Sequence, residues 1–189
     1  MLKPKDEFYI EKVLAGDSSA FAELVNRHKF NVFNICIKIL RNKEEAEEVA
    51  QDTFLKVYEK LNTFKMEAKF STWLFRIAYN LSISQLRKSK AKQIDVDDYI
   101  HEAVAEDEML ETLNQETTAE REMILKSAIE KLDNIQQLLL QLFYEKEMSI
   151  HEVAKITNLS ESNVKVKIHR ARQTLFKIMQ TSITNIEKI

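Results

Sequence analysis

Apolar residues recur at every third or fourth position along most of the chain, as they do on the buried face of an α-helix. In the first half this spacing predicts helices over residues 6–15, 17–40, 43–63, 70–79 and 82–90, with Asn80 interrupting the pattern between the last two. In the second half it predicts one helix around Ile124–Leu132 and another around Leu138–Phe143.

The C-terminal third predicts two further helices. Ser149 and Glu152 have the spacing of a capping box, which favours a short helix that begins there, and Ser160 is a second good N-cap residue. A longer helix then follows, because apolar residues recur at spacings of four and three: Val164, Ile168, Ala171, Leu175 and Ile178. After Gln180 we expect the tail to fray.

The face of this longer helix opposite the apolar seam is polar and basic. It carries Ser162, Lys165, Val166, His169 and Gln173, flanked by Arg170 and Arg172. A short helix, a tight turn and a longer helix with a basic face are typical of a helix-turn-helix DNA reader. The alternative is a helical hairpin whose cationic face is merely solvated.

Composition supports a helical fold throughout. The 189 residues contain one Gly and one Pro, whereas tight hairpins between strands need residues that tolerate positive φ. The single cysteine, Cys36, cannot form an internal disulfide and stands among isoleucines, which favours a small buried hydrophobic residue. The sequence has neither a membrane-spanning apolar run nor a signal peptide, so we expect a cytoplasmic protein that is not inserted in a membrane.

The small net charge of −2 hides a strong segregation of charge. Residues 69–93 contain six Lys or Arg and no acid, whereas residues 94–122 contain eleven acids and one Arg. From Asn163 to Asn185 there is again no acid. This alternation predicts two sites for polyanions joined by an acidic linker, residues 93–119, that avoids them.

Two helices of the first half carry candidate binding residues. On residues 43–63, Glu48, Asp52 and Glu59 surround Leu55 on the outward side, which suits a basic protein partner unless it is a plain solvated face. On residues 70–90, aromatic side chains alternate with cations, a combination that suits single-stranded DNA. Trp73 is expected to pack in the core, whereas Phe75 and Tyr79 are expected off the apolar seam. Packing and base stacking are both open for Tyr79.

Taken together, these segments resemble a bacterial RNA polymerase sigma factor of the extracytoplasmic-function type, group IV of the sigma-70 family. The start of sigma region 2 resembles AFAELVNRHKFNVFNICIKILRN, and its acidic helix resembles EEAEEVAQDTFLKVYEKLNTF. The promoter-opening segment is similar to KFSTWLFRIAYNLSISQLRK, and the region 4 helix-turn-helix to SIHEVAKITNLSESNVKVKIHRARQTL.

The resemblance implies an all-α protein of two small helical domains on a flexible linker. The domains would be residues 1–92 (region 2) and 120–180 (region 4), with 181–189 as a tail. The implied partners are promoter DNA and core RNA polymerase, through its beta-prime clamp and beta flap, and an anti-sigma protein is a candidate third partner. The resemblance implies a transcription initiation factor without catalytic residues, metal or cofactor.

It also implies roles for individual residues. Contacts to the polymerase clamp are implied for Glu48, Gln51, Asp52 and Leu55. Contacts to the minus-10 element are implied for Phe70, Trp73, Tyr79, Asn80, Arg87 and Lys88, with Asn80 matching a position that captures a flipped base. Contacts to the minus-35 element are implied for Ser162, Lys165, His169, Arg170 and Arg172.

The chain departs from the family pattern at three positions. Asn158 stands where the turn often has Gly, and Asn tolerates the left-handed conformation that such a turn uses. Lys165 and Lys167 stand where Arg is frequent, so two-pronged guanine recognition is not expected there.

Two other functions are weighed against the sigma factor. A helix-turn-helix regulator that binds an operator as a dimer explains residues 149–178 but neither the acidic helix nor the aromatic and basic segment. A metalloenzyme or hydrolase has little support, because the four histidines are scattered and no glycine-rich phosphate loop or nucleophile–base spacing occurs. His28 lies on the apolar stripe of residues 17–40 and is expected to be a partly buried core histidine and not a metal ligand.

Overall fold

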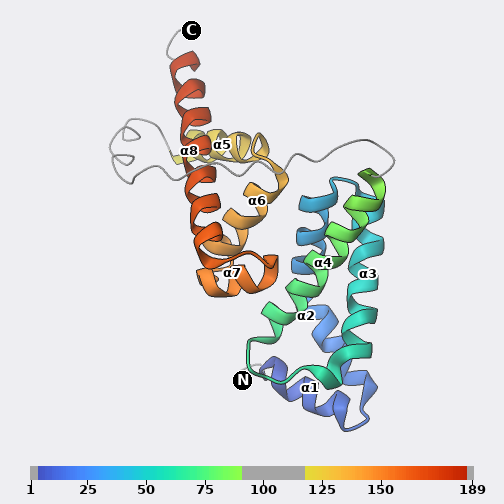
Figure 1. The fold of residues 1–189 in the computed structure, drawn as a ribbon. Coiled ribbons are helices and arrows are strands. Elements are labelled where there is room, and N and C mark those ends of the chain that lie inside the picture. The colour runs from blue at the N-terminus through green and yellow to red at the C-terminus, as the bar shows by residue number, and fades with distance from the viewer. Residues whose placement is uncertain (1–3, 91–117, 187–189) are drawn as a thin grey trace. The chain divides into compact units, whose positions relative to one another are not determined.

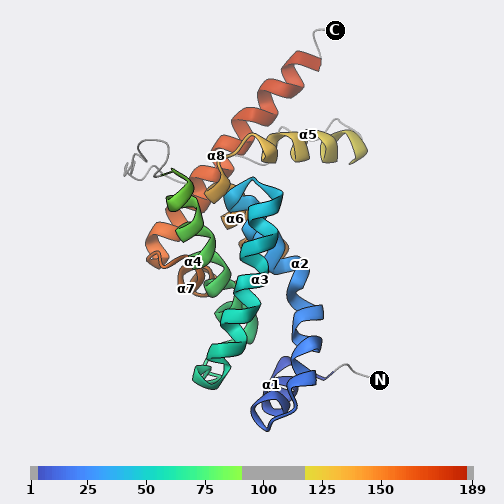
Figure 2. The same ribbon diagram turned by 90° about the vertical axis from the view of Figure 1, so that its right-hand side faces the viewer.

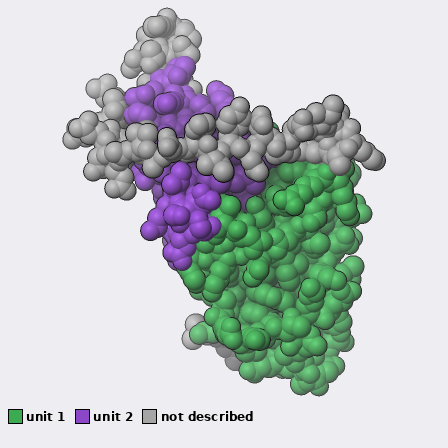
Figure 3. Space-filling model, in the orientation of Figure 1, with its two compact units in different colours: residues 1–95, 151–159 green, residues 96–150, 160–189 purple. Residues whose placement is uncertain are grey.

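The computed structural model describes residues 4–90 and 118–186, and within these ranges every regular element is a helix. The chain divides into two compact units, residues 1–95 with 151–159 and residues 96–150 with 160–189 (Figure 3). The predicted acidic linker, residues 93–119, lies outside the described residues up to position 117. The all-α fold class predicted from the sequence is confirmed.

The first unit is built around three helices that pack against one another. Its elements are α1 (Asp6–Leu14), the 3-10 turn η1 (Ser18–Ala20), α2 (Phe21–Leu40), α3 (Lys43–Lys60), the 3-10 turn η2 (Leu61–Thr63) and α4 (Phe70–Lys90). Helices α2, α3 and α4 lie side by side in both ribbon views (Figures 1 and 2). Each of the three contributes apolar residues to one core.

Local chemistry explains where these helices begin and end. Gly16, with φ of 102°, follows α1, and the Asp17 carboxylate accepts a hydrogen bond from the Ser19 amide at 3.1 Å to begin η1. Helix α2 ends at Arg41, which has a left-handed φ of 54°. The side chain of Asn42 then caps α3 by accepting a hydrogen bond from the Glu45 amide at 2.9 Å.

Helix α4 differs from the sequence-based prediction in two respects. It runs without a break through Asn80, where the sequence pattern predicts the end of one helix and the start of another. Asn80 is exposed, so its side chain does not compete with the helical backbone, and the Ser82 hydroxyl donates back to the Ala78 carbonyl at 2.8 Å. Phe75, expected off the apolar seam, is only 3% exposed because α4 packs against both α2 and α3.

Cys36 and His28 occupy positions on α2 that agree with the sequence analysis. The Cys36 side chain is fully buried, and this burial raises the pKa of its thiol to about 11, so the thiol stays protonated and packs as a small apolar group. His28 is largely buried, and its ring Nε2–H donates to the Asp6 carboxylate at 2.8 Å. It is thus a core histidine with a partner on α1.

The second unit packs α5 (Thr118–Glu130) and α6 (Asn134–Leu140) against α8 (Glu161–Ile186). Asp133 caps α6 by accepting from the Gln136 amide at 2.8 Å, and the π-helical turn η3 (Gln141–Glu145) continues α6. The fully or nearly fully buried core residues come from all of these elements: Ala128, Leu132, Leu138, Leu139, Leu142, Val164, Ile168 and Ala171. The predicted C-terminal apolar positions therefore form a core.

Between α6 and α8 the chain forms α7 (Ile150–Thr157), and residues 151–159 belong to the first unit. The predicted order of short helix, turn and longer helix is confirmed, and Asn158 in the turn has the left-handed φ of 56° that its residue type tolerates. The expected fraying after Gln180 is wrong: α8 continues to Ile186. Neither Gly nor Pro interrupts this stretch, and Ile183 and Ile186 continue the apolar spacing.

Candidate functional site

Helix α3 separates an apolar inner face from an acidic outer face. Ala46, Val49 and Val57 are buried on the inner face, together with Thr53, whose hydroxyl donates to the Val49 carbonyl at 2.7 Å. The four residues predicted to bind polymerase are all exposed: Glu48, Gln51, Asp52 and Leu55. Leu55 is 64% exposed and lies among the acids of the outer face.

The acids of this outer face are only partly neutralised. Lys43 lies 3.8 Å from Glu47, and Lys56 lies 2.9 Å from Glu59, whereas Glu48 and Asp52 have no ion-pair partner within the part of the chain that the structure describes. Sequence reasoning missed Tyr58, which is half exposed three residues after Leu55. The spacing of three from Leu55 is the signal that could have revealed it.

The beginning of α4 presents an aromatic cluster at the surface of the first unit. The ring of Trp73 is partly exposed and lies 5.2 Å from the ring of Phe64 and 6.1 Å from that of Phe70. Phe70 itself is only 2% exposed, so its ring supports Trp73 from below and is not available for a ligand. Trp73, which the apolar spacing places in the core, thus has a supported ring that also reaches the surface.

Further along α4, polar and charged side chains follow. Arg87 and Lys88 are exposed, as is Asn80, whose side-chain oxygen accepts a hydrogen bond from the Asn158 amide group at 3.0 Å. Tyr79 is partly buried, and this burial raises the pKa of its phenol, an effect that the nearby charge of Arg87 opposes. The phenol therefore stays neutral at physiological pH and can act as a hydrogen-bond donor.

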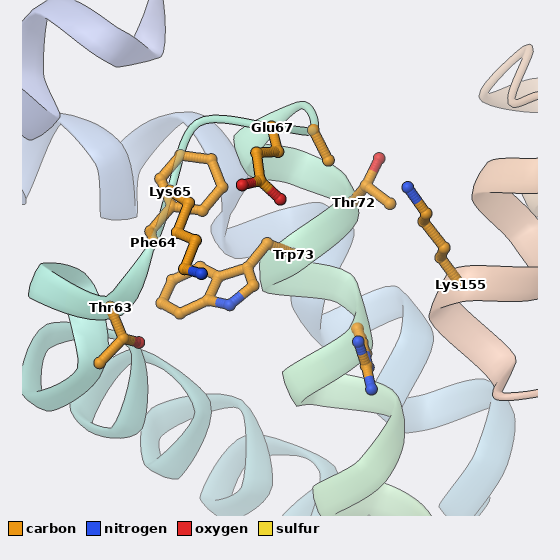
Figure 4. A pocket seen from close by; sticks show the side chains of 9 residues that line it. Thr63, Phe64, Lys65, Glu67, Thr72, Trp73 and Lys155 are labelled. Atoms are coloured by element: carbon orange, nitrogen blue, oxygen red, sulfur yellow. The ribbon is translucent and has the colours of Figure 1, made fainter.

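A cavity of about 230 Å³ lies where the chain passes from η2 into α4. Its walls include the rings of Phe64 and Trp73 and the charged side chains of Lys65, Glu67 and Arg76 (Figure 4). Pockets for drug-sized ligands measure roughly 300–1,000 Å³, so this one suits a smaller flat group. Sequence reasoning missed it because the turn that forms it depends on Met66, which adopts a left-handed φ of 55°.

Helix α8 carries the residues predicted to contact the minus-35 element. Ser160 caps the helix by accepting from the Asn163 amide at 3.2 Å, and Ser162, Lys165 and Arg172 are exposed. His169 and Arg170 are half-buried, and the Nε2 atom of His169 is buried without a hydrogen-bond partner among the described residues. The exposed residues therefore share one polar face, whereas His169 lies partly beneath it.

Comparison with known proteins identifies the family. A model of sigma-70 region 2 matches residues 24–92, and a model of sigma-70 region 4 matches residues 122–175. The chain is 34% identical over 179 residues to the ECF RNA polymerase sigma factor SigW of Bacillus subtilis strain 168, covering 89% of this chain and 93% of SigW. This protein belongs to the ECF sigma factors.

Other relatives and solved structures agree with this assignment. The ECF sigma factor is 27% identical over 186 residues to the RNA polymerase sigma-H factor of Pseudomonas aeruginosa, covering 95% of this chain and 96% of that protein. Its fold resembles that of CnrH in complex with the cytosolic domain of CnrY, with a TM-score of 0.63 at 24% identity over 93% of this chain and 97% of that one. A second similar fold is that of the sigma factor RpoE from Bartonella quintana in complex with the anti-sigma factor NepR, with a TM-score of 0.62 at 24% identity over 85% and 96% of the two chains.

Membership in this family determines the general function. The ECF sigma factor is a transcription initiation factor that directs RNA polymerase to promoters. Among the described residues no group of His, Cys, Asp or Glu is arranged to hold a metal ion, and no helix in these ranges is long and apolar enough to cross a membrane.

Proposed function

We propose that the ECF sigma factor divides its work among three surfaces. The acidic outer face of α3 binds core RNA polymerase, the surface around Trp73 on α4 holds the melted minus-10 strand, and the polar face of α8 reads minus-35 duplex. In domain terms, residues 1–92 would perform the first two tasks and residues 120–180 the third. The observation that carries the proposal is the supported Trp73 ring beside a small cavity, on a helix that is otherwise cationic.

The surface around Trp73 has the chemistry that an unpaired strand needs. Bases stack on aromatic rings, while phosphates pair with cations such as Arg87 and Lys88, which are exposed on the same helix. An extruded base can also enter a small pocket lined by an aromatic ring and polar groups. Phe70 would contribute by fixing the Trp73 ring, and Tyr79 and Asn80 would donate or accept hydrogen bonds further along the strand.

The energetics of opening a promoter fit this division. Each base-pair step that opens loses roughly 1.4 kcal/mol of stacking, and each base stacked on an aromatic ring regains about 1–3 kcal/mol. A rigid helix that presents one ring and one cavity therefore shifts the balance for a few base pairs only. Polymerase must supply the remaining contacts, which explains why a factor of this size acts together with it.

The acidic face of α3 suits a basic partner surface. Glu48 and Asp52 have no intramolecular ion pair among the described residues, and Leu55 between them supplies an apolar anchor. We assign this face to the polymerase clamp, together with Gln51. Because the factor works on polymerase, it would act in the cytoplasm, and an anti-sigma protein is a candidate partner, since CnrH and RpoE are each found with a protein bound.

Run-off transcription tests the proposed function as a whole. The purified protein is added to core polymerase from Bacillus subtilis, the source of a 34% identical relative, with a genomic promoter library as template. We expect transcripts that begin at defined sites only when the protein is present. The absence of any promoter-dependent transcript would contradict the proposal.

A substitution on α8 tests the assignment of the minus-35 reader. Lys165→Ala removes an exposed cation near the helix N-terminus and should weaken holoenzyme binding to minus-35 duplex about tenfold. The matched control is Lys177→Ala, which removes an exposed cation roughly 18 Å further along the same helix and should leave the affinity unchanged. Equal affinities for the wild type and Lys165→Ala would remove Lys165 from the reading face.

A further inference from the structure

A buried polar cluster ties α1 to α2 next to the aromatic side chains of α4. The Nε2–H group of His28 donates to one carboxylate oxygen of Asp6 at 2.8 Å, and the guanidinium of Arg27 donates to the other at 3.3 Å. The side chains of Asp6 and His28 are 21% and 12% exposed, so little water competes with their hydrogen bond. Asp6 therefore holds one edge of the His28 ring in a fixed place.

The rest of the His28 ring packs against aromatic side chains. Its centroid lies 5.5 Å from that of Phe70 and 6.4 Å from that of Phe75, with interplanar angles of 67° and 76°. Such edge-to-face pairs depend on the orientation of both rings. The Nδ1 atom of His28 is buried without a hydrogen-bond partner among the described residues, so within them Asp6 alone orients this ring by hydrogen bonding.

Packing by itself does not explain a histidine at position 28. A leucine would fill a similar space without burying a nitrogen that lacks a partner, which is unfavourable. What a histidine provides, and a leucine does not, is a flat ring that can be anchored at one edge by a hydrogen bond. The residue type therefore indicates that the orientation of this ring matters.

A series of ring contacts leads from His28 to the exposed aromatic surface. The Phe70 ring, which is 2% exposed, lies against His28 on one side and 6.1 Å from the Trp73 ring on another. Phe64 lies 5.8 Å from Phe70 and 5.2 Å from Trp73, and Figure 4 shows the last two beside the cavity. Closely packed side chains transmit small displacements to their neighbours, so the orientation of His28 bears on that of Trp73.

We propose that Asp6 and His28 are positioning residues for Trp73: the Asp6 carboxylate fixes the His28 ring, which fixes Phe70, which in turn holds the Trp73 ring ready for the melted strand. This inference rests on the proposed function, which assigns that strand to Trp73. It adds that helix α1, which carries none of the proposed DNA contacts, contributes to promoter opening. A ring that is already in place loses less conformational entropy when a base stacks on it.

The fluorescence of Trp73 distinguishes this role from a purely structural one, because Trp73 is the single tryptophan of the chain. A structural role for His28 predicts lower stability and an unchanged indole environment in the folded protein. A positioning role predicts that the Trp73 ring becomes more mobile and more accessible to water while the protein stays folded.

Three variants of the full chain test the inference without polymerase. His28→Leu keeps an apolar side chain but removes the anchored ring, and Asp6→Ala removes the acceptor. In each, acrylamide should quench Trp73 more strongly and its emission should shift to longer wavelength, with an unchanged helical circular dichroism spectrum. The double variant should match His28→Leu, because Asp6 acts on Trp73 through His28.

The control for a general loss of stability is Ile39→Ala, at a fully buried position of α2 that lies roughly 16 Å from His28 along the helix. It opens a cavity and should lower the urea midpoint of unfolding, yet leave the quenching of Trp73 in the folded protein unchanged. Wild-type quenching in His28→Leu would refute the inference, as would equal effects of His28→Leu and Ile39→Ala on Trp73.

Promoter opening is then measured with holoenzyme assembled from the full chain and Bacillus subtilis core polymerase. The template is a promoter fragment recovered by run-off transcription, and permanganate reactivity of unpaired thymines follows the opening. His28→Leu should slow opening about fivefold, a part of the stacking energy of one base, and leave binding to the closed duplex unchanged. Ile39→Ala should open the fragment at the wild-type rate.

The outcomes separate the inference from the proposed function. If wild-type holoenzyme opens no promoter, the proposed function fails and the inference fails with it. If the wild type opens the fragment and His28→Leu opens it at the same rate, the proposed function stands and the positioning role is refuted. Weaker binding of His28→Leu to the closed duplex, with an unchanged opening rate, would likewise refute it.

Discussion

Several residues of this protein adopt the left-handed backbone conformation, with positive φ, that glycine usually adopts. Among the residues that the structure describes, four that are not glycine have positive φ: Arg41, Met66, Glu147 and Asn158. Each lies where one element ends or a turn begins, in a chain with a single glycine. The left-handed conformation costs roughly 1–2 kcal/mol for most residue types and less for Asn. The turns of this protein are therefore held by the packing of the helices on either side.

Glu147 offers a direct test of this cost. It has φ of 50° and is exposed after the π-helical turn. Glu147→Gly should raise the free energy of unfolding by about 0.5–1 kcal/mol, because relief of the backbone strain exceeds the entropy that a glycine adds to the unfolded chain. Urea denaturation measures the change. Glu145→Gly, two residues earlier within the turn, is the control and should instead destabilise by about 0.5–1 kcal/mol.

Asp6 is a second residue whose environment has a measurable consequence. Its carboxylate accepts from His28 at 2.8 Å and from Arg27 at 3.3 Å, which ties α1 to α2. The hydrogen bond from His28 is the main cause that lowers the pKa of Asp6 below its ordinary value of 3.8, and burial opposes it. The folded state therefore binds fewer protons at this site than the unfolded state near that pH.

The lowered pKa of Asp6 makes the free energy of unfolding depend on pH. The stabilisation by Asp6 is complete above the ordinary pKa of 3.8 and is lost as pH falls through the lower pKa of the folded state. Asp6→Asn should reduce the free energy of unfolding at pH 7 by about 1–3 kcal/mol. As pH falls below about 4, the free energy of unfolding should decrease less steeply for this variant than for the wild type. Urea denaturation across pH checks this, and parallel profiles for the two proteins would contradict it.

At the scale of elements, two helices that each pack against two others differ in how much of their surface is buried. Helix α3 packs against α2 and α4 with one face and leaves its acidic side exposed, so the simple spacing of apolar residues described it well. Helix α4 touches both α2 and α3, which buries Phe75 and Thr72 beyond the single predicted seam. A periodicity read from sequence reports one face, and a second buried face appears only when the partners are known.

The acidic face of α3 yields a prediction about the element as a whole. Glu48→Lys combined with Asp52→Lys should weaken binding to core polymerase at least about tenfold, because like charges would then oppose a basic partner. Binding is measured by a pull-down with titrated polymerase, and circular dichroism verifies that the helices remain. The control is a double variant with the same change of charge at exposed positions outside α3, Glu11→Lys with Glu145→Lys. It should bind polymerase as the wild type does. Unchanged binding of the α3 variant would show that polymerase contacts another surface of the protein.

At the scale of the whole molecule, two modest recognition surfaces lie on separate parts of the chain. The α4 surface belongs to the first compact unit and α8 to the second. Each surface offers few contacts: α4 presents the supported ring of Trp73 and a few cations, and α8 presents a short polar and basic face. Tethered modules gain about 10²–10⁴ in apparent affinity when a scaffold allows both to bind together.

This gain predicts a large difference between the free factor and the holoenzyme. Fluorescence anisotropy with a labelled promoter fragment should show binding at least about a hundredfold tighter when core polymerase is present. The affinity of the free protein should also fall steeply with salt, because phosphate contacts dominate it. Free protein that binds the promoter as tightly as holoenzyme would indicate a stand-alone regulator instead.

The sequence by itself determined the helical class, the order of the elements and the acidic and basic faces, because helix periodicity, capping residues and charge are local properties of the chain. It also indicated the left-handed turn at Asn158, since that preference belongs to the residue. The continuity of α4, the burial of Phe75 and the cavity beside Trp73 were decided by the tertiary structure. These features depend on which helices meet and on how the turn at Met66 folds back. Such contacts join residues distant in sequence, and no local pattern encodes them.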